Sequence, residues 1–93
     1  GGLWEFPLVS LSSGENPVPK LHCLLQELGL AGQPVKLGRV RHLYSHFRLE
    51  VDVYRVQVEF HPRVAEQGFD WFSVEQLKAL SLHGAHKKIL AKL

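Results

Sequence analysis

Three consecutive residues, Tyr44-Ser45-His46, bring a phenol, a hydroxyl and an imidazole together ahead of a long alternating segment. After them apolar and charged residues alternate, with Phe47, Leu49, Val51 and Val53 on one face and Arg48, Glu50 and Asp52 on the other. This period of two predicts a strand, so the three residues form a turn at its start. A hydroxyl both donates and accepts hydrogen bonds, so such a turn can match donors and acceptors on a ligand. The alternative is a plain hairpin whose turn is polar.

Histidine and cysteine pairs are the next chemical candidates. The pairs are His83 with His86, His42 with His46, and His22 with Cys23. Zinc requires three or four convergent ligands, so we expect no metal site at any of these pairs. Cys23 flanks the leucine face of a predicted helix, and we expect a half-buried, unreactive thiol there. No Gly-rich phosphate loop and no Ser/His/Asp triad is present, so we expect no catalytic residue in this chain.

Composition places the chain among ordinary globular domains and limits its partners. It has 93 residues, 45% of them hydrophobic and 22% charged, with a net charge of +2. We expect a single domain over residues 1–93. The mild positive charge is compatible with nucleic acid as a partner. The chain contains no Met, even at position 1, so we expect a piece of a longer protein. No apolar run is long enough for a membrane span, and the single cysteine fits a reducing compartment.

Local patterns predict β-α-β-β-β-α-α, which is an α/β or α+β fold with a mixed sheet between helices. We expect a helix within Val18–Gly29, with Gly29 just past its end, and a second helix from Ser73 with a capping box. A third is expected near Gly84–Leu93, with Ala85, Ile89 and Leu93 on one face. We expect strands at Leu3–Phe6, Val35–Leu43, Phe47–Phe60 and Phe69–Phe72. In the longest strand the apolar phase changes, which predicts a β-bulge near Tyr54-Arg55. The segments Leu8–Pro17 and His61–Gly68 are predicted loops.

Three motifs together resemble a known family. They are GLWEFP at Gly2–Pro7, the YSH turn at Tyr44–His46, and LSLHGAHKKIL at Leu80–Leu90. The first is shared by Nudix hydrolases, and all three are similar to the C-terminal, Nudix-like domain of the MutY family of adenine DNA glycosylases. Phe-Ser-His is commoner in that family than Tyr-Ser-His, and Ser81 stands where the closing motif usually has Pro. The resemblance implies a Nudix-like fold, with the first strand of the usual domain missing here.

The resemblance also implies a function, which is recognition of 8-oxoguanine opposite adenine in double-stranded DNA. It places lesion binding at Tyr44, Ser45 and His46. Ser45 would contact the lesion, His46 would help to commit the Ser45 hydroxyl to accepting, and Tyr44 would pack and set the shape of the turn. Arg39, Arg41, Arg48 and Lys87 are candidates for phosphate contacts. The implied partners are this DNA and an N-terminal catalytic domain of the same protein, which would carry a [4Fe–4S] cluster. We expect no cofactor in this chain, a monomer, and a location in the bacterial nucleoid or the eukaryotic nucleus or mitochondrion.

Hydrolysis is the main competing function. Nudix hydrolases hold divalent metal on a box helix, R-E-U-x-E-E-x-G-U. Aligning its final Gly-U on Gly29-Leu30 leaves Glu27 as the only acid of the box. Magnesium prefers several hard oxygen ligands, so we expect no pyrophosphohydrolase activity. The other alternative is a Nudix-derived protein-interaction module, from which the YSH turn distinguishes this chain.

Overall fold

The computed structural model describes residues 3–59 and 68–93 and divides the chain into two compact units. The first, here called the hairpin unit, combines Gly1–Phe6, Val35–Arg55 and Phe72–Leu93. The second, here called the loop–helix unit, combines Pro7–Pro34 and Val56–Trp71. The candidate lesion-contact residues therefore all lie in the hairpin unit, while the box helix lies in the loop–helix unit.

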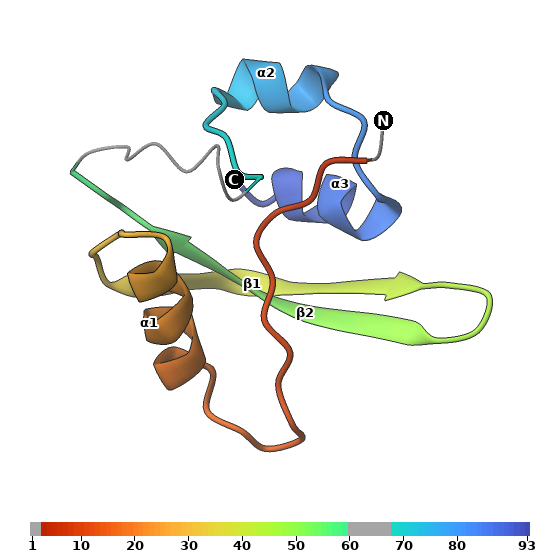
Figure 1. Ribbon diagram of the computed structural model, residues 1–93. Coiled ribbons are helices and arrows are strands. Elements are labelled where there is room, and N and C mark those ends of the chain that lie inside the picture. Colours follow the sequence, from red (N-terminus) through yellow and green to blue (C-terminus); the bar gives the residue numbers. More distant parts are fainter. Residues whose placement is uncertain (1–2, 60–67) are drawn as a thin grey trace. The chain divides into compact units, whose positions relative to one another are not determined.

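The hairpin unit is built on two strands, β1 (Pro34–Leu43) and β2 (Arg48–Val56), which form a two-stranded sheet (Figure 1). In β2 the side chains of Leu49, Val51 and Val53 are less exposed than those of Arg48 and Glu50, which confirms the predicted alternation. In β1 the phase changes by one residue at Gly38, because Leu37 and Val40 both turn inward. Gly38 has φ +153°, which L residues rarely adopt. This change of phase allows both Leu37 and Val40 to pack at the core.

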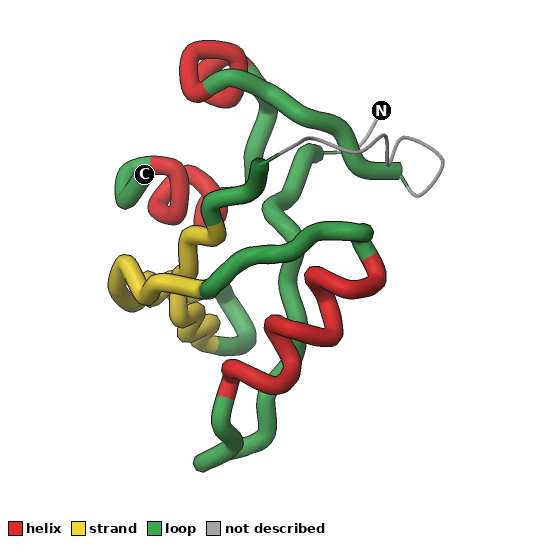
Figure 2. The backbone as a smooth tube through the Cα atoms, turned by 90° about the vertical axis from the view of Figure 1, so that its left-hand side faces the viewer, coloured by secondary structure: helices red, strands yellow, loops and turns green. Residues whose placement is uncertain are grey.

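The inner face of the hairpin forms the core of this unit with helix α3 (Gly84–Leu90), which lies beside the strands (Figure 2). Val40, Val53 and Ile89 are buried there, and Phe6, Leu37 and Val51 pack against them. Ala85 and Ile89 are buried on one face of α3, as predicted, whereas Leu93 lies beyond the helix and is exposed. Burying an Ile or Val side chain contributes about 1.5–3 kcal/mol, so these contacts hold α3 on the sheet.

The N-terminal segment and helix α2 (Val74–Ala79) complete the hairpin unit. Trp4 forms an isolated parallel bridge with Leu82, and its N–H donates to Ser81 O at 2.9 Å. The Trp4 ring also meets the Phe72 ring edge-on, with centroids 5.0 Å apart. At the start of α2 the predicted capping box is present in both directions, between Ser73 and Gln76. This cap satisfies backbone N–H groups that the first turn of a helix leaves free.

The loop–helix unit contains helix α1 (Pro17–Glu27), which the sequence predicted over Val18–Gly29. Asn16 Oδ1 accepts from the Val18 N–H at 3.1 Å and caps its first turn. Gly29 follows the helix with φ +69°, a left-handed conformation that suits glycine. Leu25 and Leu28 are buried. The segment before the helix, predicted as a loop, contains no helix or strand up to Asn16.

The α+β class is confirmed, but the described residues form fewer strands than the sequence predicted. The strand at Leu3–Phe6 is reduced to the single bridge of Trp4, and Phe69–Phe72 is not a strand. β2 ends at Val56, one residue after Tyr54-Arg55, and the β-bulge predicted there stays a prediction. Phe60 and the predicted loop that follows it, up to residue 67, lie outside the described residues. The helices of the described residues are all too short or too polar to cross a membrane.

Candidate functional site

The Tyr44–His46 segment joins β1 to β2, so the turn that the sequence predicted there is confirmed. The Tyr44 N–H donates to Phe47 O at 2.8 Å and leaves Ser45 and His46 as the two residues of the loop. Neither has positive φ, although two-residue hairpin loops commonly require it. The shape of this turn must therefore be maintained by its surroundings.

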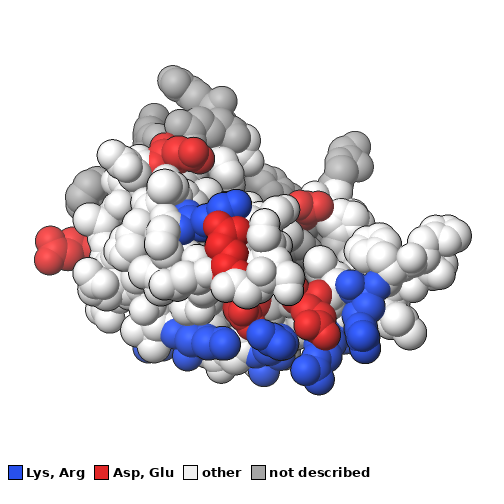
Figure 3. Space-filling model, turned by 90° about the horizontal axis from the view of Figure 1, so that it is seen from below, with Lys and Arg blue, Asp and Glu red and all other residues white. Residues whose placement is uncertain are grey.

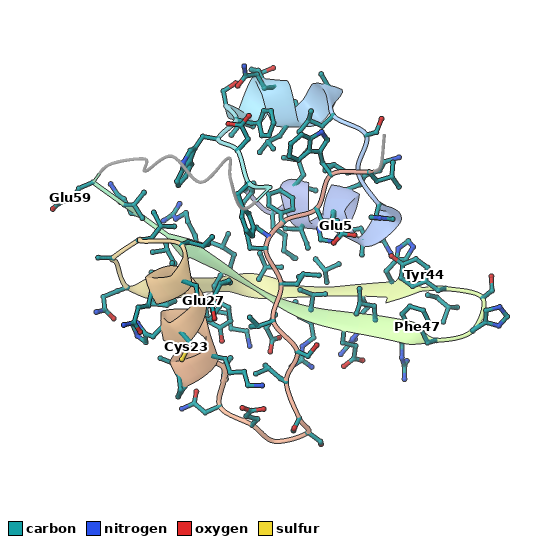
Figure 4. All side chains as sticks on the ribbon, in the orientation of Figure 1. Glu5, Cys23, Glu27, Tyr44, Phe47 and Glu59 are labelled. Carbon is teal, nitrogen blue, oxygen red and sulfur yellow. The ribbon has the colours of Figure 1, made fainter. Side chains whose placement is uncertain are left out.

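Aromatic rings provide that support. The rings of Tyr44 and Phe47 are stacked, with centroids 4.8 Å apart and planes 26° apart (Figure 4). On its other side Tyr44 meets the His42 ring edge-on at 4.6 Å. Aromatic pairs of this kind contribute about 0.5–1.5 kcal/mol beyond their buried area. The stack joins the two ends of the turn and agrees with the expectation that Tyr44 packs and shapes it.

Ser45 and His46 are exposed at the end of the hairpin. Within the part of the chain that the structure describes, their side chains form no hydrogen bond, ion pair or ring contact. Two large apolar side chains beside them are also exposed, Leu43 at 77% and Phe47 at 57%. The hydroxyl of Ser45 and the imidazole of His46 thus have their hydrogen-bonding capacity free for a ligand.

The outer face of the hairpin carries cations that are held by two carboxylates. Arg39 Nε donates to Asp52 Oδ1 at 2.8 Å, and Lys36 Nζ lies 3.6 Å from the same oxygen. Glu50 is within 3.4 to 3.9 Å of three arginines, which are Arg39, Arg41 and Arg48. Blue and red side chains accordingly lie next to one another on the face drawn in Figure 3. Three of the four predicted phosphate contacts therefore lie in one cluster, here called the arginine face.

The two strongest partners of the arginine face perturb each other's ionisation. The hydrogen bond from Arg39 is the main cause that lowers the pKa of Asp52, and the charges of Arg39 and Lys36 add to it. The same bond to Asp52 raises the pKa of Arg39. Both effects favour the charged pair, so Asp52 competes directly with any phosphate for this guanidinium.

The fourth predicted phosphate contact, Lys87, lies on α3 and is exposed. Within the described residues its side chain has no partner. The neighbouring Lys88 Nζ donates to Arg41 O at 2.8 Å, and Lys92 passes over Gly38. Both of these lysines therefore contact β1 from α3 and the residues that follow it.

Sequence reasoning missed His42, Glu50 and Asp52 as parts of this region. With Ser45-His46 as a two-residue loop, strand register pairs Arg41 with Glu50 and Arg39 with Asp52. The length of the loop alone would therefore have predicted these ion pairs. The contact of His42 with Gly84 had no such signal, because these residues lie in elements that the sequence does not connect.

The box helix was the candidate metal centre of a hydrolase. Glu27 is the only carboxylate on α1, and it and Cys23 are exposed (Figure 4). The prediction that Cys23 is half-buried is wrong, because it lies on the polar side of the helix. No group of three His, Cys, Asp or Glu residues that could hold a metal ion occurs among the described residues. One carboxylate does not fit magnesium, and one cysteine does not fit a [4Fe–4S] cluster.

His83 and His86 both contact residues of the N-terminal segment. His86 is only 3% exposed, and its Nδ1 accepts from the Phe6 N–H at 3.0 Å. Burial lowers the pKa of His86, against a smaller raising effect of Glu5 and with a lowering effect of His83. His83 Nε2 lies 3.1 Å from Glu5 Oε1. This pair therefore anchors the N-terminal segment to α3.

A hollow of about 290 Å³ lies in the loop–helix unit. Its lining is formed by Ala31, Gly32, Gln57, Val58 and Glu59. Glu59, labelled in Figure 4, is the single ionisable side chain among them. One carboxylate without a second titratable group offers no acid–base pair, so the hairpin turn is the stronger candidate site.

Comparison with known proteins identifies the family of the chain. The NUDIX domain family matches residues 1–92. The chain is 35% identical to the adenine DNA glycosylase of Mus musculus and 33% identical to those of Rattus norvegicus and Homo sapiens, over 95% of its length in each case. It spans 17 to 18% of the length of these relatives. No solved structure matches the chain significantly. The chain belongs to the NUDIX domain family, in the form found in the C-terminal part of adenine DNA glycosylases.

Proposed function

We propose that this domain recognises 8-oxoguanine paired with adenine in double-stranded DNA, as the lesion-reading part of an adenine DNA glycosylase. The observation that carries the proposal is the exposed Ser45-His46 loop. A backbone hydrogen bond between Tyr44 and Phe47 closes this loop, and the contacting aromatic rings support it. It occurs in a chain whose relatives are adenine DNA glycosylases. Excision of adenine would be performed by another domain of the same protein, where a [4Fe–4S] cluster would also be bound.

The chemistry of the lesion explains why a hydroxyl turn suits it. Guanine presents N7 as an acceptor on its major-groove edge. In 8-oxoguanine N7 carries hydrogen and C8 carries a carbonyl, so an acceptor is replaced by a donor and an acceptor. Ser45 can accept from N7–H, and the backbone N–H groups of the turn can donate to the new carbonyl. The free hydroxyl of Ser45 is available for this contact.

A hydroxyl alone would not exclude ordinary guanine, because it can also donate to an unmodified N7. Discrimination therefore requires neighbours that commit Ser45 to accepting. His46 and the backbone of the turn are the candidates for this role. Arg39, Arg41, Arg48 and Lys87 would position the domain on phosphates without reading the sequence. The proposed location of the protein is therefore that of the DNA, which is the nucleoid in a bacterium and the nucleus or mitochondrion in a eukaryote.

The alternative of a Nudix pyrophosphohydrolase is disfavoured by the single carboxylate of α1. A protein-interaction module would use apolar exposed surface, but it would not require a free hydroxyl on a rigid turn. The two ideas make different predictions about the Ser45-His46 loop, because only lesion recognition depends on its hydrogen-bonding groups.

The test is single-turnover excision of adenine by the full-length glycosylase that carries this domain. Rates are measured opposite 8-oxoguanine and opposite guanine for wild type, Ser45→Ala and the Ser45→Ala/His46→Ala double variant. We expect Ser45→Ala to reduce the preference for the lesion about fivefold, or about 1 kcal/mol, since backbone groups of the turn remain. The double variant should lose more. A double variant with the wild-type preference would contradict the proposal.

A further inference from the structure

The imidazole of His42 connects the beginning of α3 with the turn. A Cβ placed on Gly84 would lie 2.6 Å from His42 Cε1 and 2.8 Å from Nε2. At such distances one of the two groups must move, so a side chain at position 84 would displace the His42 ring. The absence of a side chain at Gly84 thus leaves room for the His42 ring.

On its other side the same ring meets Tyr44, and Tyr44 meets Phe47. A continuous series of contacts therefore runs from Gly84 through three rings to both ends of the Ser45-His46 loop. The Tyr44 N–H bond to Phe47 O closes the loop at the same place. A displacement of the His42 ring would be transmitted to the residues that frame the loop.

No hydrogen bond holds the His42 ring at Nδ1. This atom is buried and has no hydrogen-bond partner among the described residues. A buried polar atom without a partner costs free energy, so packing must hold the ring in place. The His42 ring therefore acts through its packing between Gly84 and Tyr44, and not through a hydrogen bond at Nδ1.

We propose that His42 is a positioning residue for lesion recognition, which acts through Tyr44 on the geometry of the Ser45-His46 loop. The inference rests on the proposed function and adds to it a residue outside the turn. Gly84 is the second part of the device, because its missing side chain provides the space for the ring.

The experiment uses the full-length glycosylase and four variants, which are His42→Ala, Gly84→Ala, the double variant of both, and Ser73→Ala. Ser73→Ala removes the cap of α2 and serves as a control for loss of stability alone. The readouts are the ratio of adenine excision rates opposite 8-oxoguanine and guanine, and the hydrogen exchange of the Tyr44 amide in the domain.

We expect His42→Ala and Gly84→Ala each to reduce the excision ratio about two- to tenfold, the range that an aromatic contact of this kind supplies. Exchange of the Tyr44 amide should accelerate in both. The double variant should be no worse than His42→Ala, since the methyl group introduced by Gly84→Ala then has no ring to displace. Ser73→Ala should leave the ratio unchanged.

Three results would overturn the proposal. In the first, His42→Ala keeps the wild-type excision ratio while the Ser45/His46 double variant shows a reduced ratio. This result would refute the role of His42 and leave the proposed function intact. The effects of His42→Ala and Gly84→Ala could be additive, which would show that they act separately. Unchanged ratios in both the His42 and the Ser45/His46 variants would overturn the proposed function together with this one.

Discussion

The Nδ1 atom of His86 accepts a hydrogen bond from the backbone N–H of Phe6, a residue that precedes it by 80 positions. The rings of the two residues are also stacked, with centroids 6.0 Å apart. This contact fixes the N-terminal segment on α3, and it requires a His86 ring whose Nδ1 carries no proton. The structure of the hairpin unit therefore depends on the protonation of one buried side chain.

The pH dependence of stability should reveal this requirement. Burial lowers the pKa of His86 below its ordinary value of 6.5. As the pH falls below about 6.5, the unfolded chain takes up a proton that the folded chain does not, so the free energy of unfolding decreases. The slope cannot exceed about 1.4 kcal/mol per pH unit for one group, and it should level off below the pKa of the folded state.

Urea denaturation between pH 5 and pH 8 measures this slope. His86→Asn is the matched control, because its side-chain oxygen can still accept from Phe6 while the titration is lost. The difference in stability between wild type and this variant should narrow as the pH falls through 6.5. An equal pH dependence in both proteins would show that other groups are responsible.

The cap of α2 gives a second prediction. Ser73 Oγ accepts from the Gln76 N–H at 3.1 Å, and the Gln76 side chain accepts from the Ser73 N–H at 2.8 Å. Ser73→Ala should lower the free energy of unfolding by about 1 kcal/mol. Ser45→Ala, at the exposed turn, should change it by less than about 0.5 kcal/mol. Equal losses in the two variants, measured by urea denaturation, would refute this interpretation of the cap.

Patterns of neighbouring residues were sufficient to predict the elements that are stabilised by contacts between neighbouring residues. The capping box of α2, the leucines of α1 and the alternation of β2 each act within a few residues, and each was predicted correctly. The strand predicted at Phe69–Phe72 failed because a strand needs a partner, which short apolar runs cannot specify. The change of phase at Gly38 and the contact between His42 and Gly84 depend on tertiary packing.

The same distinction applies to the candidate site. The turn was predicted because its residues are adjacent, and the cations were predicted because they are charged and alternate. Their pairing with Glu50 and Asp52 follows from the register of the strands. Charge counted along the sequence overstates what is free to bind phosphate, because part of it is already paired.

The composition of α1 predicts that this domain hydrolyses no nucleoside diphosphate derivative. Glu27 is the only carboxylate of the box helix, and magnesium requires several oxygen ligands. The test incubates the domain with magnesium or manganese and a panel of such compounds, including oxidised dGTP. Turnover that vanishes in Glu27→Gln but persists in Glu15→Gln would establish a catalytic box.

The last prediction concerns the arginine face. Glu50 contacts Arg39, Arg41 and Arg48, so it competes with phosphate for three guanidinium groups. Glu50→Gln should strengthen binding of the domain to duplex DNA about two- to fivefold near 0.1 M salt. The slope of log affinity against log salt should steepen by up to about 0.9 for each additional phosphate that the released arginines bind.

Glu75→Gln is the matched control, because it changes the net charge equally but releases only Lys78, on α2. Fluorescence anisotropy over a series of salt concentrations measures both quantities for the two variants. If the arginine face contacts phosphate, the increase in affinity and in slope belongs to Glu50→Gln alone. If both variants bind more tightly to the same extent, only the net charge matters, and Arg39, Arg41 and Arg48 do not face the DNA.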